Sequence, residues 1–337
     1  MEETCPLGSK ARPGGARMTI FAPAKIDETS GSLRFPVARA ALHSPLSAFR
    51  KFLKFSSTHV TAGLWAIFKI PSARDRNATL WLYLKFISLL MIFPLIRARK
   101  ISEAQVLGAT MKFADYGTFL GLISEILFQR IYSFKSSSAS PLIFDAGSNI
   151  GMSILFFKRL YPRSRVMGFE PDPQTFELLQ TNVRRNRWEN VELHNKALHD
   201  SEGEINFYTD PDRIGSGKMS TVRERFPDSA NRTVRCQTVE TVRLSTFIRE
   251  EIDLLKMDIE GAEIAVISEL AESGRLRLIN EMFIEYHHHL KVDEDNLSRM
   301  LLPLEENGFG YQISSPSDLP WARKSVQPML IYAYRLS

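Results

Sequence analysis

The sequence predicts an α/β fold with a mostly parallel sheet and helices on both of its faces. Residues 142–145 form a short apolar run that ends in Asp145, and small residues follow before a helical pattern begins. This order is typical of a buried strand that turns sharply into a helix. From there to the C-terminus, short apolar strands alternate with amphipathic helices, which favours a parallel sheet that is covered on both sides.

The elements follow in a regular order along the chain. After the first strand we expect strands at 165–170, 191–196, 252–257, 282–286, 309–313 and 329–334. Segments 204–209 and 233–243 alternate apolar and polar residues, which predicts an antiparallel pair. The expected helices cover 149–160, 173–186, 263–272 and 294–307, and the second of them starts at prolines that suit a first helical turn.

Three parts are expected along the chain. Residues 1–45 are rich in Gly, Pro, Ser and Arg and are predicted to be disordered, and residues 46–135 are predicted to form a helical extension that includes a helix over 102–135. The apolar run 80–96 contains a lysine and a proline and is shorter than the ~20 apolar residues of a spanning helix. Residues 136–337 are then the main domain.

The charge is distributed unevenly along the 337 residues. Residues 1–100 hold 16 Lys and Arg against 5 Asp and Glu, whereas the remainder holds 27 against 33. A basic N-terminal part before an acidic domain indicates a presequence or contact of residues 46–100 with an anionic membrane surface. The alternative is that residues 46–100 pack on the main domain. It argues against a nucleic-acid partner, because such enzymes carry positive charge beside their chemistry. Only two cysteines occur, which favours the cytoplasm.

The glycine-containing loop after the first strand is the first candidate site. Gly147 and Gly151 allow the backbone to approach a ligand, and Ser148 or Asn149 is expected to cap the following helix. The N–H groups of that helix suit a carboxylate, and an ordinary tight strand–helix connection is the alternative. Glu170 ends the next strand 25 residues after Asp145, a spacing that suits an acid that accepts hydrogen bonds from ribose hydroxyls.

Further acidic and histidine side chains are expected on the same rim of the sheet. Asp258 and Glu260 follow strand 252–257, and a carboxylate there could orient a substrate hydroxyl or accept its proton. Glu285 and His287 end the next strand, where His287 could act as a general base. Ligation of a metal by His287 and Asp258 is the alternative, and no metal site is assigned.

Residues 113–335 resemble the FkbM family of S-adenosylmethionine-dependent methyltransferases. The resemblance rests on motifs in a fixed order: Ser124–Leu127 and Tyr132, the loop Asp145–Gly151, Phe169–Pro173, Asn182 and Asn186, Asn190–Val191, Lys196–Leu198, Gly203, Leu255–Glu263 and Ile284–His287. The family usually has Ala where Ser148 stands, a change between small residues that leaves the loop intact.

The resemblance implies a seven-stranded Rossmann-like sheet that binds S-adenosylmethionine. Asp145 and the loop from Gly147 to Gly151 would hold the methionine part of this cofactor, and Glu170 would bind the ribose. Asp172 and Ala197–Leu198 would line the adenine. The family typically methylates hydroxyl oxygens on sugars, polyketides and other natural products, so a small-molecule or glycan hydroxyl is the expected acceptor.

The expected mechanism is in-line displacement at the methyl group, with Asp258 as the base and His287 behind it. Glu260 and Glu285 are further catalytic candidates. Two other functions stay open. A nicotinamide oxidoreductase would have the same sheet and the same acid that binds the ribose, but it requires the loop motif Gly-x-Gly-x-x-Gly, which this loop lacks. The second open function is that of a membrane-associated protein that binds the cofactor without catalysing a reaction.

Overall fold

The computed structural model describes residues 67, 70, 76–77, 79–84, 86, 102–209, 219–220, 234–288, 296–315 and 327–336. Val60–Ser337 form one compact unit by their contacts. The expected disorder of residues 1–45, the basic stretch 46–55 and most of the apolar run 80–96 lie outside the described residues. The expected domain boundary at residue 136 stays a prediction.

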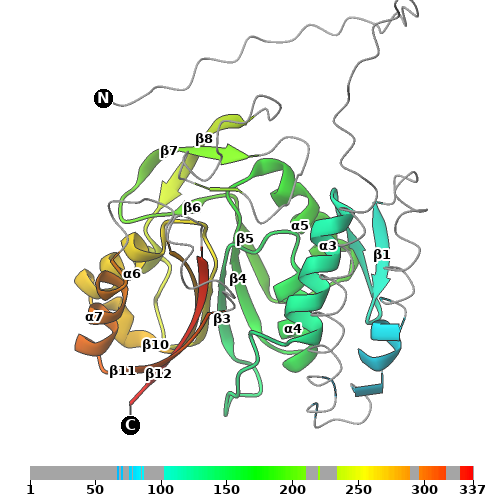
Figure 1. Cartoon of the computed structure of the whole chain (residues 1–337), viewed down its shortest axis with the longest axis horizontal. Coiled ribbons are helices and arrows are strands. Elements are labelled where there is room, and N and C mark those ends of the chain that lie inside the picture. Colours follow the sequence, from blue (N-terminus) through cyan, green and yellow to red (C-terminus); the bar gives the residue numbers. More distant parts are fainter. Residues whose placement is uncertain are drawn as a thin grey trace, which may run out of the picture. The chain divides into compact units, whose positions relative to one another are not determined.

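A seven-stranded sheet in the order β11-β12-β10-β9-β3-β4-β5 forms the centre of the unit (Figure 1). Neighbours among the five strands β3, β4, β5, β9 and β10 are parallel, whereas β12 pairs antiparallel with β10 and β11. The strands are β3 (Leu142–Ala146), β4 (Arg165–Phe169), β5 (Val191–His194), β9 (Ile252–Met257), β10 (Ile279–His288), β11 (Phe309–Ser314) and β12 (Gln327–Arg335). The predicted α/β fold and its mostly parallel, seven-stranded sheet are confirmed.

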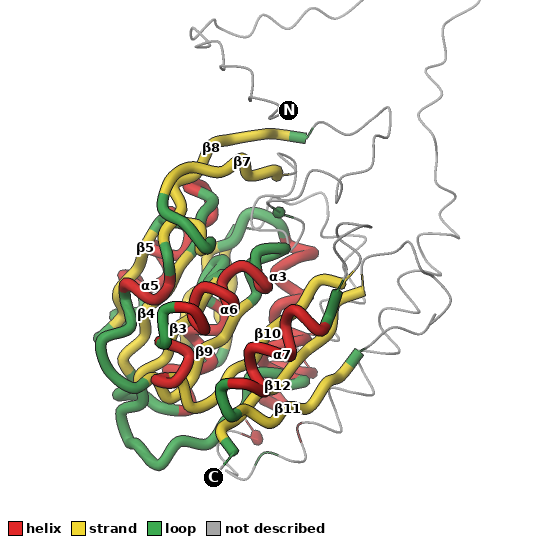
Figure 2. The backbone as a smooth tube through the Cα atoms, turned by 90° about the vertical axis from the view of Figure 1, so that its left-hand side faces the viewer, coloured by secondary structure: helices red, strands yellow, loops and turns green. Residues whose placement is uncertain are grey.

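Helices cover both faces of this sheet, as predicted. Figure 1 shows α4 (Met152–Leu160) and α5 (Pro173–Arg185) on one side and α6 (Glu263–Glu272) and α7 (Ser298–Glu306) on the other. Figure 2 shows α6 and α7 lying over β9, β10 and β12. The core consists of apolar side chains that point from β3, β9, β10 and β12 into α6 and α7, and Leu255, Met282 and Ile331 within it are fully buried. The sheet is therefore held rigidly beneath its carboxyl-terminal rim.

A second, three-stranded sheet lies beyond that rim in the order β6-β8-β7 (Figure 1). It consists of β6 (Ala197–Leu198), β7 (Gly203–Thr209) and β8 (Arg235–Val242), and β7 and β8 are the antiparallel pair that the alternation predicts. Phe207 and Val239 pack with Ala197 in a small apolar cluster of this sheet. The second sheet therefore forms a wall above the ends of the parallel strands.

The expected helix over 102–135 is wrong in its first part. Residues Glu103–Val106 (β1) and Ala109–Lys112 (β2) form an antiparallel hairpin, and Leu107 and Gly108 turn with φ of 50° and 88°. Helix α3 (Tyr116–Leu122) follows and continues as a π-helical turn, Ile123–Phe128. The hairpin forms here because side-chain amides of α5 complete its hydrogen bonds, a tertiary contact that local periodicity does not reveal.

Two further expectations concern the start of α4 and the membrane. Neither Ser148 nor Asn149 caps α4, because its cap position is Gly151, with φ of 89° and no side-chain cap bond. The structure describes no helix that is both long and apolar enough to cross a bilayer. Contact of residues 46–100 with a membrane surface stays a prediction.

Candidate active site

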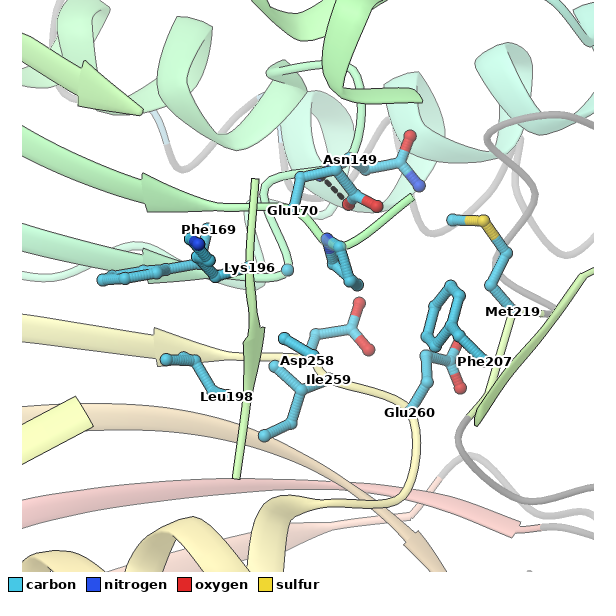
Figure 3. Close-up of a pocket in the computed structure, with 13 residues that line it drawn as sticks. Asn149, Phe169, Glu170, Lys196, Leu198, Phe207, Met219, Asp258, Ile259 and Glu260 are labelled. Atoms are coloured by element: carbon cyan, nitrogen blue, oxygen red, sulfur yellow. Dashed lines mark hydrogen bonds between the residues drawn. The ribbon is translucent and has the colours of Figure 1, made fainter. Parts of the chain in front are cut away.

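A pocket opens where β3, β4 and β9 end, beneath the wall formed by the second sheet. The empty space at this place, with its open mouth included, is about 580 Å³. Figure 3 shows Glu170 and Asn149 on one side of this pocket and Asp258 and Glu260 on the other. The predicted residues Gly147, Ala197 and Leu198 line it as well. The strand ends therefore bring together acids that are up to 90 positions apart in the sequence.

The glycine loop after β3 is packed too closely for any side chain at its first glycine. Gly147 has φ of 78°, and a Cβ atom there would lie 1.8 Å from the backbone oxygen of Asp258. The N–H groups of Gly147 and Ser148 both donate to the carbonyl of Phe169, at 2.9 and 2.8 Å. Glycine is required because the loop crosses directly over the end of β9.

Glu170 presents a buried carboxyl group to the pocket. It is 2% exposed, and its two oxygens accept the backbone N–H groups of Asn149 and Asp172, each at 3.0 Å. Burial raises the pKa of Glu170 to about 8, even though these N–H donors favour the charged form. A buried acid with a shifted pKa in a pocket is a candidate for ligand recognition.

The other predicted cofactor residues lie behind the loop rather than along the pocket. Asp145 is fully buried and accepts a 2.6 Å hydrogen bond from Ser153. Ser148 donates to the backbone oxygen of Asp145, and Asp172 caps α5 through the N–H of Thr175. Gly151 lets Leu179 approach, because a Cβ atom there would lie 2.9 Å from its Cδ1. These four residues shape the loop, and their direct contact with a cofactor stays a prediction.

Three of the four catalytic candidates form one cluster at the edge of the pocket. The Nε2 atom of His287 lies 2.9 Å from Glu260 Oε2 and 4.0 Å from Asp258 Oδ1. The expected arrangement has Asp258 as the base with His287 directly behind it, whereas the partner that Nε2 of His287 contacts at hydrogen-bond distance is Glu260. Burial alone would lower the pKa of His287, but the charges of Glu260 and Glu263 raise it well above its usual value. The two carboxylates therefore favour the protonated form of the imidazole.

Glu285, the fourth candidate, lies apart from the cluster and does not line the pocket. Its carboxyl group accepts a short hydrogen bond from the hydroxyl of Tyr132. Burial raises the pKa of Glu285 to about 8, and the charge of Asp258 adds to this effect. Glu285 is therefore placed to modulate the charge around Asp258.

Two buried charges at the site were missed at the sequence level. Lys256 is 2% exposed, and its ammonium group donates to the carbonyls of Ala146 and Gly147 at 3.1 and 2.6 Å and lies 3.4 Å from Asp145. Burial would lower the pKa of Lys256, but the carboxylates of Asp145 and Asp258 raise it above its ordinary value. The available signal was a lysine inside the apolar strand 252–257.

Glu263 is the second missed residue, since it was expected only as an acid in the first turn of a helix. It is 2% exposed, and its Oε1 lies 2.9 Å from Nδ1 of His287. Both of its oxygens also accept the N–H of Gly261 at 3.1 Å. Burial would raise the pKa of Glu263, but these contacts keep it below its usual value. Glu263 therefore fixes the orientation of the His287 ring.

Comparison with known families identifies the domain that contains this pocket. Residues 145–311 match the profile of the methyltransferase FkbM domain. The chain contains an FkbM methyltransferase domain. The resemblance seen in the motifs is thereby confirmed, and the chain is a methyltransferase.

Individual relatives agree with the family. The chain is 29% identical over 229 residues to "Methyltransferase 1" of Beauveria bassiana, a match that covers 63% of this chain and 88% of the relative. It is 29% identical to the "31-O-demethyl-FK506 methyltransferase FkbM" of Streptomyces tacrolimicus, over 53% of this chain and 79% of the relative. A solved FkbM methyltransferase of Methylobacillus flagellatus is 15% identical with a TM-score of 0.40, and the match covers 74% of this chain and 60% of the other.

The part of this FkbM methyltransferase that matches the family profile contains the whole candidate site. It begins at Asp145, at the end of β3, and extends past the His287 cluster into β11. The hairpin β1–β2 and the whole of β12 fall outside the matched span. The family relationship therefore covers the pocket, whereas the hairpin β1–β2, which bonds to Asn182 and Asn186, is outside that span.

Proposed function

We propose that this methyltransferase transfers a methyl group from S-adenosylmethionine to a hydroxyl oxygen of a small molecule or glycan. The observation that carries the proposal is the pair of acids across the pocket. Glu170, buried at the end of β4, faces the space beside the glycine loop, and Asp258, at the end of β9, lines the opposite side (Figure 3). One acid suits a ribose and the other suits an acceptor hydroxyl.

The residues of the pocket fit the adenosyl cofactor. Among the described residues that line it, Lys196 is the one cation, and it stands against three acids, Glu170, Asp258 and Glu260. This balance suits the positive sulfonium of S-adenosylmethionine and is poorly suited to the two phosphates of a nicotinamide dinucleotide. Apolar side chains, among them Leu198 and Phe207, offer a surface for an adenine ring.

When bound, S-adenosylmethionine supplies an activated methyl group on sulfur. The main task of the chain is then to hold an acceptor oxygen in line with that methyl group, and such positioning can contribute ~7–11 kcal/mol to catalysis. The carboxylate of Asp258 is exposed to the pocket on 29% of its side chain and is placed to accept the hydroxyl proton. Proton transfer to such a base typically adds a factor of ~10²–10⁴.

His287 supports this step as a cation and not as the base. Its ring is shared between Glu260 on one nitrogen and Glu263 on the other, each at 2.9 Å. Because a protonated imidazole cannot accept another proton, Asp258 is the better candidate for the base. The positive ring also reduces the repulsion between Asp258 and Glu260.

The "31-O-demethyl-FK506 methyltransferase" among the relatives supports oxygen as the methylated atom. The test is incubation of the protein with S-adenosylmethionine labelled on its methyl group and a panel of sugars, uronic acids and polyketide alcohols. We expect label on a hydroxyl oxygen, and we expect the variant Asp258→Asn to bind the donor but to transfer slowly. Label on nitrogen or carbon would refute O-methylation. Donor binding without any transfer, unchanged by Asp258→Asn, would support the non-catalytic binder instead.

A further inference from the structure

The cluster of His287, Asp258 and Glu260 has the arrangement of a metal site. One ligand atom from each residue lies within 4.8 Å of the other two. The ring nitrogen of His287 is 2.9 Å from one carboxylate oxygen and 4.0 Å from the other. In an octahedral ion with bonds of ~2.1 Å, adjacent ligands are ~3.0 Å apart and opposite ligands ~4.2 Å apart. The two distances from Nε2 of His287 are thus close to those between adjacent and between opposite ligands of a small divalent cation.

The outer contacts of His287 are those of a metal-bound histidine. Metal-ligating histidines usually give their second N–H to a carboxylate or carbonyl, which fixes the tautomer and aims the other nitrogen at the metal. Here Nδ1 lies 2.9 Å from Oε1 of Glu263, a carboxylate that is 2% exposed. The nitrogen that remains, Nε2, is the one that points at Glu260 and Asp258. Glu263 therefore has the position of an outer carboxylate.

Asp258 gives an independent indication. Its Oδ1 atom is buried and has no hydrogen-bond partner among the described residues, although the side chain as a whole reaches the pocket. A buried acceptor without a partner is costly, and a ligand normally satisfies it. This is the same oxygen that lies 4.0 Å from Nε2 of His287.

We infer that His287, Asp258 and Glu260 bind a divalent first-row cation at the acceptor side of the pocket. One nitrogen with two carboxylate oxygens is a mixed set that suits Mn²⁺ or Zn²⁺. A ligating imidazole is neutral, so the cation takes the place of the proton that Nε2 of His287 carries in the metal-free protein, and the second oxygen of Asp258 stays free to accept a proton. Three protein ligands leave positions open for oxygens of the acceptor, and a hydroxyl bound to the cation loses its proton more readily. This inference rests on the proposed function for its role in catalysis. It favours acceptors that present two adjacent oxygens, such as a vicinal diol or a uronic acid.

The test measures binding of Mn²⁺ alone, without donor or acceptor, by the loss of the free-ion signal in electron paramagnetic resonance. We expect saturable binding of one ion per chain, weakened at least about tenfold in Glu260→Gln and in His287→Ala. Glu263→Gln, which changes only the outer carboxylate, should weaken binding roughly 10–100-fold. Thermal unfolding of each variant shows whether it is folded, and the Mn²⁺-induced rise in melting temperature gives a second readout.

A surface pair provides the matched control. His194 Nε2 lies 3.1 Å from Glu192 Oε1, nearly the spacing in the cluster, but no third His, Cys, Asp or Glu among the described residues completes a metal site with this pair. The variant His194→Ala should bind Mn²⁺ as the wild type does. Absence of saturable binding to the wild type, or equal binding by folded wild type, Glu260→Gln and His287→Ala, would overturn the inference. Neither result would contradict the proposed methyl transfer, which the labelled-donor assay tests separately.

Discussion

Replacing Glu170 by Gln is the most direct test of the predicted binding of the cofactor ribose by this residue. The substitution keeps the shape of a side chain that is 2% exposed but removes its charge. Two ribose hydroxyls that donate to a carboxylate would contribute ~1.5–3 kcal/mol each. From this we subtract about 1.4 kcal/mol at pH 7, the free energy needed to ionise a carboxyl group whose pKa is about 8. The net loss of ~2–5 kcal/mol corresponds to binding that is roughly 30-fold to several thousand-fold weaker.

The same residue predicts how the affinity depends on pH. Burial raises the pKa of Glu170 to about 8, so below pH 8 the free protein carries this carboxyl group in its protonated form. Donor binding through the carboxylate must then release a proton, and the affinity should rise about tenfold per unit from pH 6 to pH 8 and level off above. The Glu170→Gln variant cannot ionise there and should lose this rise. At each pH the dissociation constant of the variant is divided by that of the wild type, so that any effect of titration of the donor itself cancels.

Calorimetric titration with S-adenosylmethionine at several pH values measures both effects. Glu250, an exposed acid paired with Arg165 at the other end of β4, provides the control, and Glu250→Gln should bind the donor as the wild type does. Thermal unfolding checks that Glu170→Gln is folded, because Gln leaves one of the two backbone N–H donors without its charged acceptor. Wild-type affinity in the folded variant, or a wild-type affinity that does not change with pH, would refute the role of Glu170.

Three further substitutions test the rest of the site. Asp258→Asn should leave donor affinity within a few-fold and lower kcat by ~10²–10⁴, and an unimpaired rate in the labelled-donor assay would remove Asp258 from the mechanism. Gly147→Ala should lower the free energy of unfolding by ~2–4 kcal/mol in urea unfolding. The control is Gly274→Ala, which has a similar φ of 70° but open space around it, and it should lower this free energy only by the ~1–2 kcal/mol of backbone strain. Equal losses would contradict the close contact at Gly147. Lys256→Met leaves Asp145 buried without its cation and should destabilise the protein by about 3–5 kcal/mol in the same measurement, and a neutral effect would show that this pair is dispensable.

The parallel sheet could be predicted because its strands carry their own signal. Buried strands that are covered on both faces are apolar throughout, and in β3 and β4 each such run ends at an acid or a tight turn. The rim then follows from topology, since the carboxyl ends of parallel strands meet at one edge. Glu170 and Asp258 could therefore be assigned to one pocket from their positions at strand ends alone.

The hairpin β1–β2 could not be predicted in this way. Its turn at Leu107–Gly108 has left-handed backbone angles, yet its strands are only four residues long and their pattern also suits a helix. The partners that stabilise it come from far along the chain. Asn182 and Asn186 accept the N–H groups of Lys112 and Thr110 at 2.7 and 2.8 Å. Pairing over 70 residues or more is invisible to a local window.

The charge network of the site was equally hidden. Lys256 was expected only as part of a strand motif, because its partner Asp145 lies 111 positions earlier in the sequence. Glu263 has the sequence context of an ordinary acid in the first turn of a helix, and only the fold brings it to His287 on β10. Sequence patterns thus locate the strand ends, whereas the pairing of charges depends on which strands are neighbours.

The pairing of β3 with β9 explains how one pocket can align two ligands. Ala146 accepts the N–H of Asp258 at 3.1 Å, and the ammonium group of Lys256 bonds to the carbonyls on both sides of the turn at Gly147. The candidate cofactor loop and the candidate base are therefore fixed against each other by direct contacts. Since in-line transfer depends on the distance and angle between acceptor oxygen and methyl group, a small shift of either strand end would lower kcat more than donor affinity. The buried lysine is thus best understood as the part that keeps both halves of the site in register.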